Sequence, residues 1–324
     1  MSTRTALVTG ITGQDGSYLA EQLLDEGYAV VGISRQSQPA ASSGRLLHVA
    51  CDITDQKALD AVLREHHPAE VYNLAARSSG AGMFDDAVQM GEINGLVVAK
   101  LLEAIRNVDP AIRFCQASSS ELFGDALSAP QSERTEFRPR SPYGAAKLYA
   151  HTMLRVYRER YGLYACSAIL FNHESPRRRL EFVTRKVTHA AASIKLGRAT
   201  GLQVGSLEAR RDWGFAGDYM RAMWLMLQHR FAQDYVIATG ELHSVRDLCD
   251  IAFSRVGLDY RDFVSESAEH ARGPEPVTLV GNAARARGEL QWSPRLDFRQ
   301  LVTSMVDADL NTLQQPLHKK ATQP

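Results

Sequence analysis

The chain has 324 residues, of which 44% are hydrophobic and 23% are charged. This composition is typical of a globular protein and excludes a disordered or fibrous chain, while the length favours one large domain with a smaller second lobe. Thirty-seven basic residues balance thirty-seven acidic residues. No overall charge therefore favours binding to nucleic acid or an anionic membrane, and an anionic ligand needs a local site.

The four cysteines, Cys51, Cys115, Cys166 and Cys249, form no C-x-x-C pair or other metal-ligand spacing. We therefore expect no metal site. Buried, unreactive thiols are the simplest interpretation, and they suit a reducing cytoplasm. The N-terminus lacks the layout of a signal peptide, and no apolar stretch reaches the roughly 18 residues of a membrane span. We expect a cytoplasmic protein without a membrane partner.

Strand-like and helical patterns alternate along the first half of the chain. Helices are predicted after the first glycine turn and at 55–66 and 95–107. Strands are predicted at 6–8, 29–33, 46–49, 71–74, 113–117 and 165–171. Such alternation implies right-handed βαβ crossovers and a parallel sheet that is covered on both faces. The fold class is therefore α/β, with a Rossmann-type, doubly wound parallel sheet.

The pattern changes after Phe171, where residues 172–211 are rich in Arg, Lys and His and contain one long predicted helix, 182–196. A helix at 218–228 and a strand at 235–238 are predicted to return to the sheet. We expect a Rossmann domain of residues 1–172 plus about 216–242. A smaller, interleaved C-terminal substrate lobe would then comprise 173–215 and 243–313, including 279–292, with a frayed tail at 314–324.

The sequence GITGQDG places glycines at positions 10, 13 and 16, between a predicted strand and a predicted helix. Glycines at this spacing allow a tight turn and a close approach of backbone to a pyrophosphate, whose charge lies at the positive end of the helix. Three spaced glycines alone are a weak signal, but the strand–turn–helix context supports a dinucleotide site over an ordinary loop. The predicted contacts are Gly10, Thr12, Gly13, Gln14, Asp15 and Gly16.

Arg35 follows the second predicted strand, where the adenosine ribose of a dinucleotide is expected to lie. An acidic residue there favours NAD, whereas an arginine can pair with the 2′-phosphate of NADP. NADP is therefore the predicted cofactor, and a solvated surface arginine is the alternative. Further predicted cofactor contacts follow the third and fourth strands: Asp52, Ile53, Leu74, Ala75 and Ala76.

Ser119, Ser120 and Glu121 follow the predicted strand 113–117, and Tyr143 and Lys147 lie in SPYGAAK. A tyrosine and a lysine four residues apart share one face of a helix. The ammonium of Lys147 favours the phenolate and lowers the pKa of Tyr143 from about 10. Tyr143 can then accept the proton of a sugar hydroxyl while hydride leaves the same carbon for a nicotinamide. An exposed pair at this spacing is common by chance, and the serines and the glycine turn make it specific.

Glu121 indicates more chemistry than a simple oxidation. Once a sugar carbon is oxidised to a ketone, the proton on the neighbouring carbon becomes acidic, and a carboxylate can remove it so that water leaves the next carbon. The hydride can then return, which makes the sequence redox-neutral. The alternative is that Glu121 caps or supports the following loop.

Several stretches resemble one family in particular. QASSSELFG, RPRSPYGAAKLYAH, NHESP and RDWGFAGDY are similar to motifs of the GDP-mannose 4,6-dehydratase family, within the extended short-chain dehydrogenase/reductase superfamily. The similarity runs over nearly the whole chain. It implies a tightly held NADP and conversion of a GDP-linked mannose-type sugar to its 4-keto-6-deoxy form.

By this resemblance Glu121 is the base for C5, Tyr143 is the base for the C4 hydroxyl, and Lys147 supports Tyr143 and the nicotinamide ribose. Ser119 occupies a position that is usually threonine. Considered alone, each basic residue carried over is more often a solvated charge. The implied cofactor contacts are Ser78, His173 and Arg178, and the implied GDP-sugar contacts are Ser79, Gly80, Ser120, Asn172, Thr184, Lys186, Arg211, Arg272 and Glu275.

The sequence departs from the family pattern at several positions. Residues 77–82 (RSSGAG) lack side-chain volume near the expected sugar end, which raises GDP-manno-heptose as a substrate alongside GDP-mannose. Gln89 replaces a tyrosine, Arg179 a small residue, and Val277 an acidic residue. The loop after Arg35 is shortened, which favours a homodimer through helices that include 143–157, with a tetramer still possible.

The hypothesis is a GDP-sugar 4,6-dehydratase with internal hydride recycling. An NADP-dependent nucleotide-sugar reductase or epimerase is the alternative, and it would need no carboxylate at Glu121. A non-catalytic, redox-sensing dinucleotide-binding protein is a third possibility. The presence of both Tyr143 and Lys147 argues against that third class.

Overall fold

The computed structural model describes residues 3–35, 44–77, 84–267 and 278–315. Its centre is a seven-stranded sheet in the order β11-β6-β5-β4-β1-β2-β3, in which all neighbouring strands are parallel. This confirms the predicted doubly wound, Rossmann-type α/β fold. The strands are β1 (Thr5–Thr9), β2 (Ala29–Ser34), β3 (Leu46–Ala50), β4 (Glu70–Asn73), β5 (Arg113–Ala117), β6 (Ala165–Leu170) and β11 (Tyr235–Ile237).

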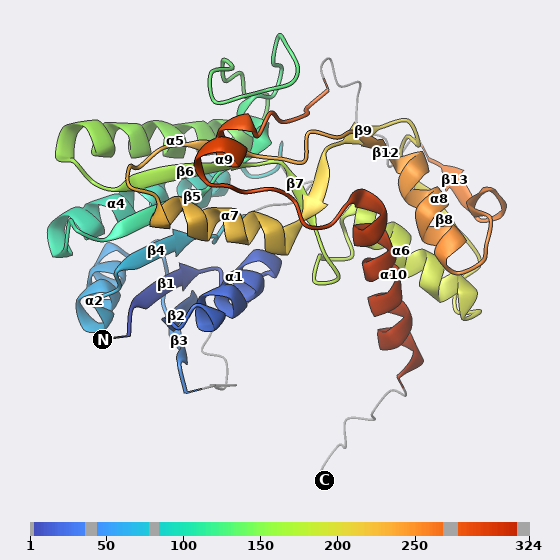
Figure 1. Cartoon of the computed structure of the whole chain (residues 1–324), viewed down its shortest axis with the longest axis horizontal. Coiled ribbons are helices and arrows are strands. Elements are labelled where there is room, and N and C mark those ends of the chain that lie inside the picture. The colour runs from blue at the N-terminus through green and yellow to red at the C-terminus, as the bar shows by residue number, and fades with distance from the viewer. Residues whose placement is uncertain (1–2, 36–43, 78–83, 268–277, 316–324) are drawn as a thin grey trace. The chain divides into compact units, whose positions relative to one another are not determined.

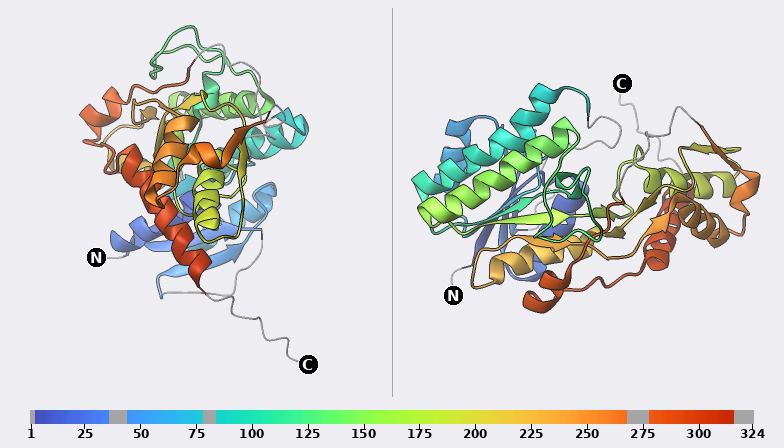
Figure 2. Two further views of the ribbon diagram at one scale, coloured as in Figure 1. Left: turned by 90° about the vertical axis from the view of Figure 1, so that its right-hand side faces the viewer. Right: turned by 90° about the horizontal axis from the view of Figure 1, so that it is seen from above.

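Helices cover both faces of this sheet (Figure 1). On one face α1 (Gln14–Asp25) and α7 (Ala216–Gln228) pack together, and on the other lie α2 (Gln56–His66), α4 (Val97–Val108) and α5 (Pro142–Tyr161). Figure 2 shows α4 and α5 side by side along their face. Successive residues of β1 alternate between the two cores, with Ala6 and Val8 in one and Leu7 in the other. Burial on both faces explains the nearly continuous apolar strands.

The chain forms two compact units, and their division is interleaved. Described residues 3–173, 211–242 and 278–295 belong to the first unit, and 174–210, 243–267 and 296–315 to the second. Within the second unit α6 (Val183–Lys195) packs against α8 (Val245–Arg255) and α10 (Phe298–Gln314), while β8 (Leu202–Val204) pairs with β13 (Val264–Glu266).

Shorter elements complete the described chain. They are α3 (Ala87–Gly91), a π-helical turn (Glu92–Leu96), 3₁₀ turns at Ser120–Leu122 and Tyr260–Asp262, β7 (Asn172–Glu174), β9 (Arg210–Arg211), β10 (Trp213–Phe215), β12 (His243–Ser244) and α9 (Ala284–Glu289). Of these, α9 had been predicted as a short helix, although in the wrong unit. The predicted tail, 314–324, lies almost entirely outside the described residues.

Two of the predicted domain boundaries are corrected. Residues 211–215 and 278–295 were expected in the substrate lobe but belong to the first unit. Asp212 gives the physical reason, because its buried carboxylate accepts hydrogen bonds from the amides of Thr239 (2.9 Å), Gly240 (2.9 Å) and Gly281 (3.1 Å). A buried carboxylate needs such partners, so three separate segments are held together at one side chain.

All four cysteines are buried and free. No helix in the described part of the chain combines the length and the apolar character that a membrane span requires. No group of three or more His, Cys, Asp or Glu side chains in the same residues could hold a metal ion.

Candidate functional site

The glycine turn between β1 and α1 has the close backbone packing that its sequence predicts. Gly10 has a φ of +71°, and a Cβ atom there would lie 2.8 Å from the amide nitrogen of Ala75. A Cβ atom on Gly16 would lie 2.3 Å from the carbonyl oxygen of Gly10. Helix α1 begins with Gly13 as its N-cap and has no side-chain cap. The first turn of α1 therefore offers backbone amides to an anion, as dinucleotide sites require.

Asp15, in the first turn of α1, forms an ion pair with His173. Nε2 of His173 lies 3.0 Å from Oδ2 of Asp15, and Nδ1 lies 2.8 Å from the carbonyl oxygen of Phe171. The imidazole stacks on the ring of Tyr219 at a centroid distance of 4.9 Å, and Gln14 donates from Nε2 to the carbonyl oxygen of His173 (3.2 Å). An unpaired carboxylate here would repel a phosphate group. The structure thus brings the predicted cofactor residues Gln14, Asp15 and His173 together.

The predicted adenosine end lies at the carboxyl ends of β2 and β3. Arg35 is exposed directly after β2. Asp52 follows β3 and accepts hydrogen bonds from Thr54, whose amide and hydroxyl hold the pKa of that carboxyl below its usual value, with smaller contributions from Lys100 and Arg35. Ile53, between Asp52 and Thr54 in the sequence, is half-buried. Arg35 and Asp52 are therefore close enough to interact, at the edge where a ribose is expected.

The catalytic residues predicted from sequence come from two segments that touch. Ser119 caps a 3₁₀ turn, and its Oγ accepts a hydrogen bond from the amide of Glu121 (3.2 Å). Helix α5 begins with Pro142, directly before Tyr143, and Ser141 caps it by accepting from the amide of Gly144 (3.1 Å). A Cβ atom on Gly144 would lie only 2.6 Å from the carbonyl oxygen of Glu121. The absence of a side chain at this position lets the two segments meet.

Lys147 is buried, with 2% of its surface exposed. Its Nζ donates to the carbonyl oxygen of Ala117 at 2.8 Å and lies 5.7 Å from the ring centroid of Tyr143. Burial lowers the pKa of Lys147 to about 8, and the negative charge of Asp15 opposes this effect. A positive charge near the phenol ring of Tyr143 is the arrangement expected to stabilise a phenolate.

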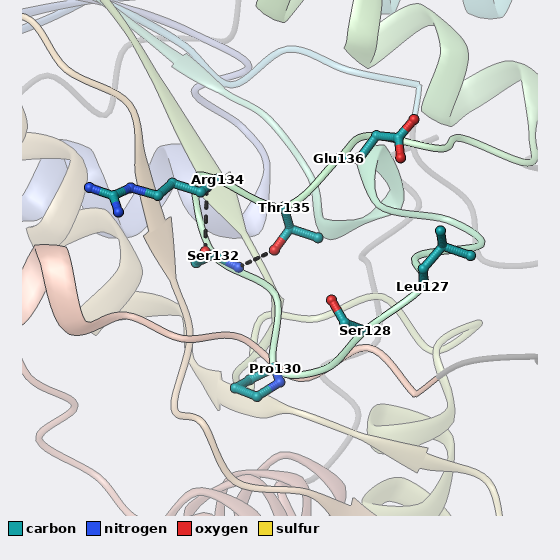
Figure 3. Close-up of a pocket in the computed structure, with 7 residues that line it drawn as sticks. All are labelled: Leu127, Ser128, Pro130, Ser132, Arg134, Thr135 and Glu136. Carbon is teal, nitrogen blue, oxygen red and sulfur yellow. Dashed lines mark hydrogen bonds between the residues drawn. The ribbon is translucent and has the colours of Figure 1, made fainter.

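The loop between β5 and α5 is tightly hydrogen-bonded and carries a surface hollow of about 460 Å³ (Figure 3). Ser132 and Thr135 close a turn, in which the amide of Ser132 donates to Oγ1 of Thr135 at 2.9 Å. Gln131 is buried and donates to the carbonyl oxygen of Ser128 (2.7 Å), while its Oε1 accepts from the amide of Val280 (2.9 Å). None of the residues that line the hollow belongs to the predicted site.

In the second unit, two predicted ligand-binding residues converge on Glu174. Oγ1 of Thr184 donates to Oε2 of Glu174 at 2.6 Å, and Nε of Arg178 lies 3.2 Å from the same oxygen. The guanidinium carbon of Arg178 also lies 3.5 Å from the ring centroid of Phe182. The Arg178–Glu174 contact is an ion pair without hydrogen-bond geometry at Nε. Lys186 lies two residues beyond Thr184 in α6.

The remaining predicted positions are dispersed. Ser120 is buried in the 3₁₀ turn, Asn172 begins β7, and Arg211 ends β9. Ala76 is exposed beyond β4. The predictions on Ser78, Ser79, Gly80, Arg272 and Glu275 lie outside the described residues, as does the departure at Val277.

Two departures from the family pattern contact each other. The guanidinium of Arg77 pairs with Asp86 (2.9 Å) and donates to Oε1 of Gln89. The backbone of Arg77 is held by the buried side chain of Asn94, which accepts from its amide (3.0 Å) and donates to its carbonyl oxygen (3.1 Å). Asn94 lies in the π-helical turn, a feature that often marks functional sites.

Sequence reasoning missed a set of buried polar residues behind the site: Thr9, Asn73, Gln116 and Asn94. Two of them offered a signal. Asn73 and Gln116 each follow apolar residues in β4 and β5, and polar residues are rarely fully buried without a specific partner.

A family profile described as GDP-mannose 4,6 dehydratase matches residues 7–305. GDP-mannose 4,6 dehydratase 1 of Arabidopsis thaliana is 47% identical over 95% of this chain and 90% of its own length. The GDP-mannose 4,6-dehydratase of Vibrio cholerae is 40% identical over 97% of this chain and 95% of its own length.

The chain belongs to the GDP-mannose 4,6-dehydratase family. This confirms the resemblance inferred from the motifs, and it makes the protein a lyase of a family that uses a nicotinamide cofactor. The fold is shared more widely. A UDP-glucose 4-epimerase from Thermotoga maritima, solved with UDP-glucose, superposes with a TM-score of 0.85 at 23% identity, over 96% of this chain and 100% of its own.

Replacing Lys147 by Met should stabilise this dehydratase-family protein while removing activity. The pKa of Lys147 is lower in the folded protein than in the unfolded chain. Burial of the charged ammonium therefore lowers the free energy of unfolding at neutral pH. We expect the unfolding free energy to rise by about 1–2 kcal/mol at neutral pH, because the lost hydrogen bond offsets part of the gain.

The free energy of unfolding of the wild type and of Lys147→Met is measured by urea titration, with circular dichroism as the signal. The contribution of Lys147 to stability should increase as the pH rises from about 8 toward the unfolded-state pKa of about 10.4, and Lys147→Met should lack that increase. A lower free energy of unfolding for Lys147→Met than for the wild type at neutral pH would contradict the idea that burial of the Lys147 charge is costly.

Proposed function

We propose that this protein is a GDP-mannose-type 4,6-dehydratase that forms the 4-keto-6-deoxy sugar with internal return of the hydride. The observation that carries the proposal is the contact between the turn of Glu121 and the start of α5, made possible by Gly144. It supports the presence of a carboxylate beside the proton-transfer residues Tyr143 and Lys147. Membership of the GDP-mannose 4,6-dehydratase family supports the same chemistry.

In the first step Tyr143, as phenolate, accepts the proton of the C4 hydroxyl, and Ser119 orients that hydroxyl. Lys147 stabilises the phenolate through its charge. A bound nicotinamide dinucleotide supplies the acceptor for the C4 hydride and its later donor. The product of this step is a 4-keto sugar, in which the C5 proton is acidic.

In the second step Glu121 removes the C5 proton, and the C6 hydroxyl leaves as water after it is protonated, also by Glu121. The resulting C5–C6 double bond is conjugated with the C4 ketone. Hydride returned to C6 and a proton delivered to C5, which replaces the one that Tyr143 accepted from the C4 hydroxyl, give the 6-deoxy product and restore the Tyr143 phenolate. The overall change is the loss of one water molecule, with no net oxidation.

The cofactor is proposed to be NADP rather than NAD. Arg35 supports this, because it is exposed at the end of β2 and close enough to influence the pKa of Asp52. A guanidinium there suits a 2′-phosphate. The dinucleotide is proposed to contact the glycine turn, Leu74, Ala75, Ala76, His173 and Arg178.

The sugar is proposed to be GDP-mannose or GDP-manno-heptose. The small residues of 77–82 support the larger sugar, although 78–83 lie outside the described residues. The proposed contacts with the GDP-sugar are Ser120, Asn172, Thr184, Lys186 and Arg211, together with the sequence predictions Ser79, Gly80, Arg272 and Glu275. A cytoplasmic location also stays a prediction.

A homodimer is proposed through the face formed by α3, the π-helical turn and α5. Five large apolar side chains are exposed on these elements: Val88, Leu96, Tyr149, Val156 and Tyr161. Tyr149 and Val156 are seven residues apart on α5 and share one face. Exposed apolar residues grouped on adjacent elements are typical of a protein interface, and a second copy of this chain is the proposed occupant.

The substrate is tested by incubating the purified protein with GDP-mannose and, separately, with GDP-manno-heptose. Mass spectrometry of the product should show the loss of one water molecule from at least one of them. A clear rate advantage for the heptose would support the larger pocket. If neither sugar nucleotide loses water, the dehydratase proposal is wrong.

Glu121→Gln separates a dehydratase from a reductase or epimerase in the same assay. Loss of a general base typically costs 10²–10⁴-fold, so water loss should fall about a thousandfold while oxidation at C4 persists. Glu136→Gln, which changes an exposed carboxylate outside the site, is the matched control and should retain full activity. Undiminished water loss in Glu121→Gln would exclude Glu121 as the base.

Val156→Asp should shift the protein from dimer to monomer, because a charge in an apolar interface is costly to desolvate. Sedimentation velocity at several protein concentrations measures the change. Phe231→Asp alters another exposed apolar residue, outside these elements, and should leave the dimer intact. A wild-type monomer, or a Val156→Asp dimer of unchanged affinity, would contradict this interface.

A further inference from the structure

A chain of hydrogen bonds crosses three adjacent strands behind the catalytic residues. Oγ1 of Thr9, at the end of β1, donates to Oδ1 of Asn73 at 2.5 Å. Nδ2 of Asn73, at the end of β4, donates to Oε1 of Gln116 at 2.7 Å. Nε2 of Gln116, in β5, donates to the carbonyl oxygen of Ala117 at 2.6 Å. All three side chains are buried, so the chain of donors and acceptors replaces the water that they lack.

This chain ends on the acceptor that Lys147 uses. The carbonyl oxygen of Ala117 accepts from Nζ of Lys147 at 2.8 Å and from Nε2 of Gln116. A carbonyl oxygen has two lone pairs, so both donors can be accommodated. The position of this one oxygen is therefore set by Gln116 as well as by the strand.

We propose that Gln116 is a positioning residue for Lys147. Its side-chain amide fixes the Ala117 carbonyl oxygen on which the ammonium rests, and Asn73 and Thr9 fix Gln116 in turn. Gln116 acts only through Lys147 and touches neither substrate nor cofactor.

The burial of Lys147 explains why such a support is needed. A desolvated ammonium gains by moving toward water or by losing its proton, and burial already lowers the pKa of Lys147 to about 8. A hydrogen bond from a charged donor is stronger than one between neutral groups. A fixed acceptor therefore keeps the charge 5.7 Å from the ring centroid of Tyr143.

The other end of the chain reaches the glycine turn. Oγ1 of Thr9 accepts from the amides of Leu74 (3.2 Å) and Ala75 (3.0 Å). Thr9 directly precedes Gly10, which packs against Ala75. The same set of side chains thus aligns the segment that the dinucleotide is proposed to contact with the lysine that supports Tyr143.

The test is an NMR titration of protein labelled at the tyrosine Cζ, with the Tyr143 signal assigned by its loss in Tyr143→Phe. Gln116→Met keeps the side-chain volume and removes the hydrogen bonds. At a given pH the phenolate fraction of Tyr143 should fall about tenfold in this variant. Asn73→Leu breaks the chain one residue earlier and should cause a smaller fall in the same direction, which keeps the test valid if Gln116→Met does not fold.

Ser167→Ala is the matched control. Ser167 is buried in β6 and pairs in register with Gln116, and its hydroxyl makes no hydrogen bond. Its removal should leave the titration of Tyr143 unchanged. An unchanged titration in Gln116→Met and Asn73→Leu would overturn the proposal and leave these residues with a purely structural role.

A second readout rests on the proposed function. In Gln116→Met, kcat with GDP-mannose should fall about tenfold near neutral pH and recover at higher pH, with KM unchanged. A structural defect would instead lower kcat by the same factor at every pH. Because the titration needs no substrate, failure of the proposed function and failure of this proposal are distinguishable.

Discussion

The arrangement of the candidate site depends on one close contact, between the backbone of Gly144 and the carbonyl oxygen of Glu121. Any side chain at position 144 would separate the first turn of α5 from the turn that follows β5. Without that approach, Tyr143 and Lys147 would be displaced from Ser119 and Glu121, although each segment would keep its own local structure. The side-chain caps at Ser119 and Ser141 fix where the two segments begin. The contact between the segments therefore fixes their relative position.

Burial then determines the electrostatics of the site. Lys147 is held in low-dielectric surroundings that lower its pKa, and Asp15 restores part of the preference for the charged form. Asp15 also lies close to His173, with 3.0 Å between Oδ2 and Nε2. A cation beside Tyr143 and a helix start without a side-chain cap therefore lie in one unit. The cost to stability is the usual one for a functional site.

Much of the fold followed from the sequence, because apolar strands that alternate with amphipathic helices leave little choice other than a parallel sheet. The glycine turn and the placement of Tyr143 and Lys147 on one helix could also be predicted from the sequence, because each depends on local backbone geometry. The assignment of 278–295 to the first unit could not be predicted in this way, because it depends on a hydrogen bond from the amide of Gly281 to Asp212, which is distant in the sequence. Likewise the chain through Asn73 and Gln116 needs strands far apart in sequence to be adjacent, which periodicity does not specify.

The central claim is that one site performs oxidation, elimination and hydride return on the same sugar. GDP-mannose carrying deuterium at C4, mixed with carbon-labelled GDP-mannose without deuterium, tests it in one mass spectrum. Internal return predicts deuterium at C6 of the product, confined to the molecules that carried it at C4. Deuterium found in the carbon-labelled product, or lost to solvent, would show that the hydride leaves the site between steps and would contradict internal return.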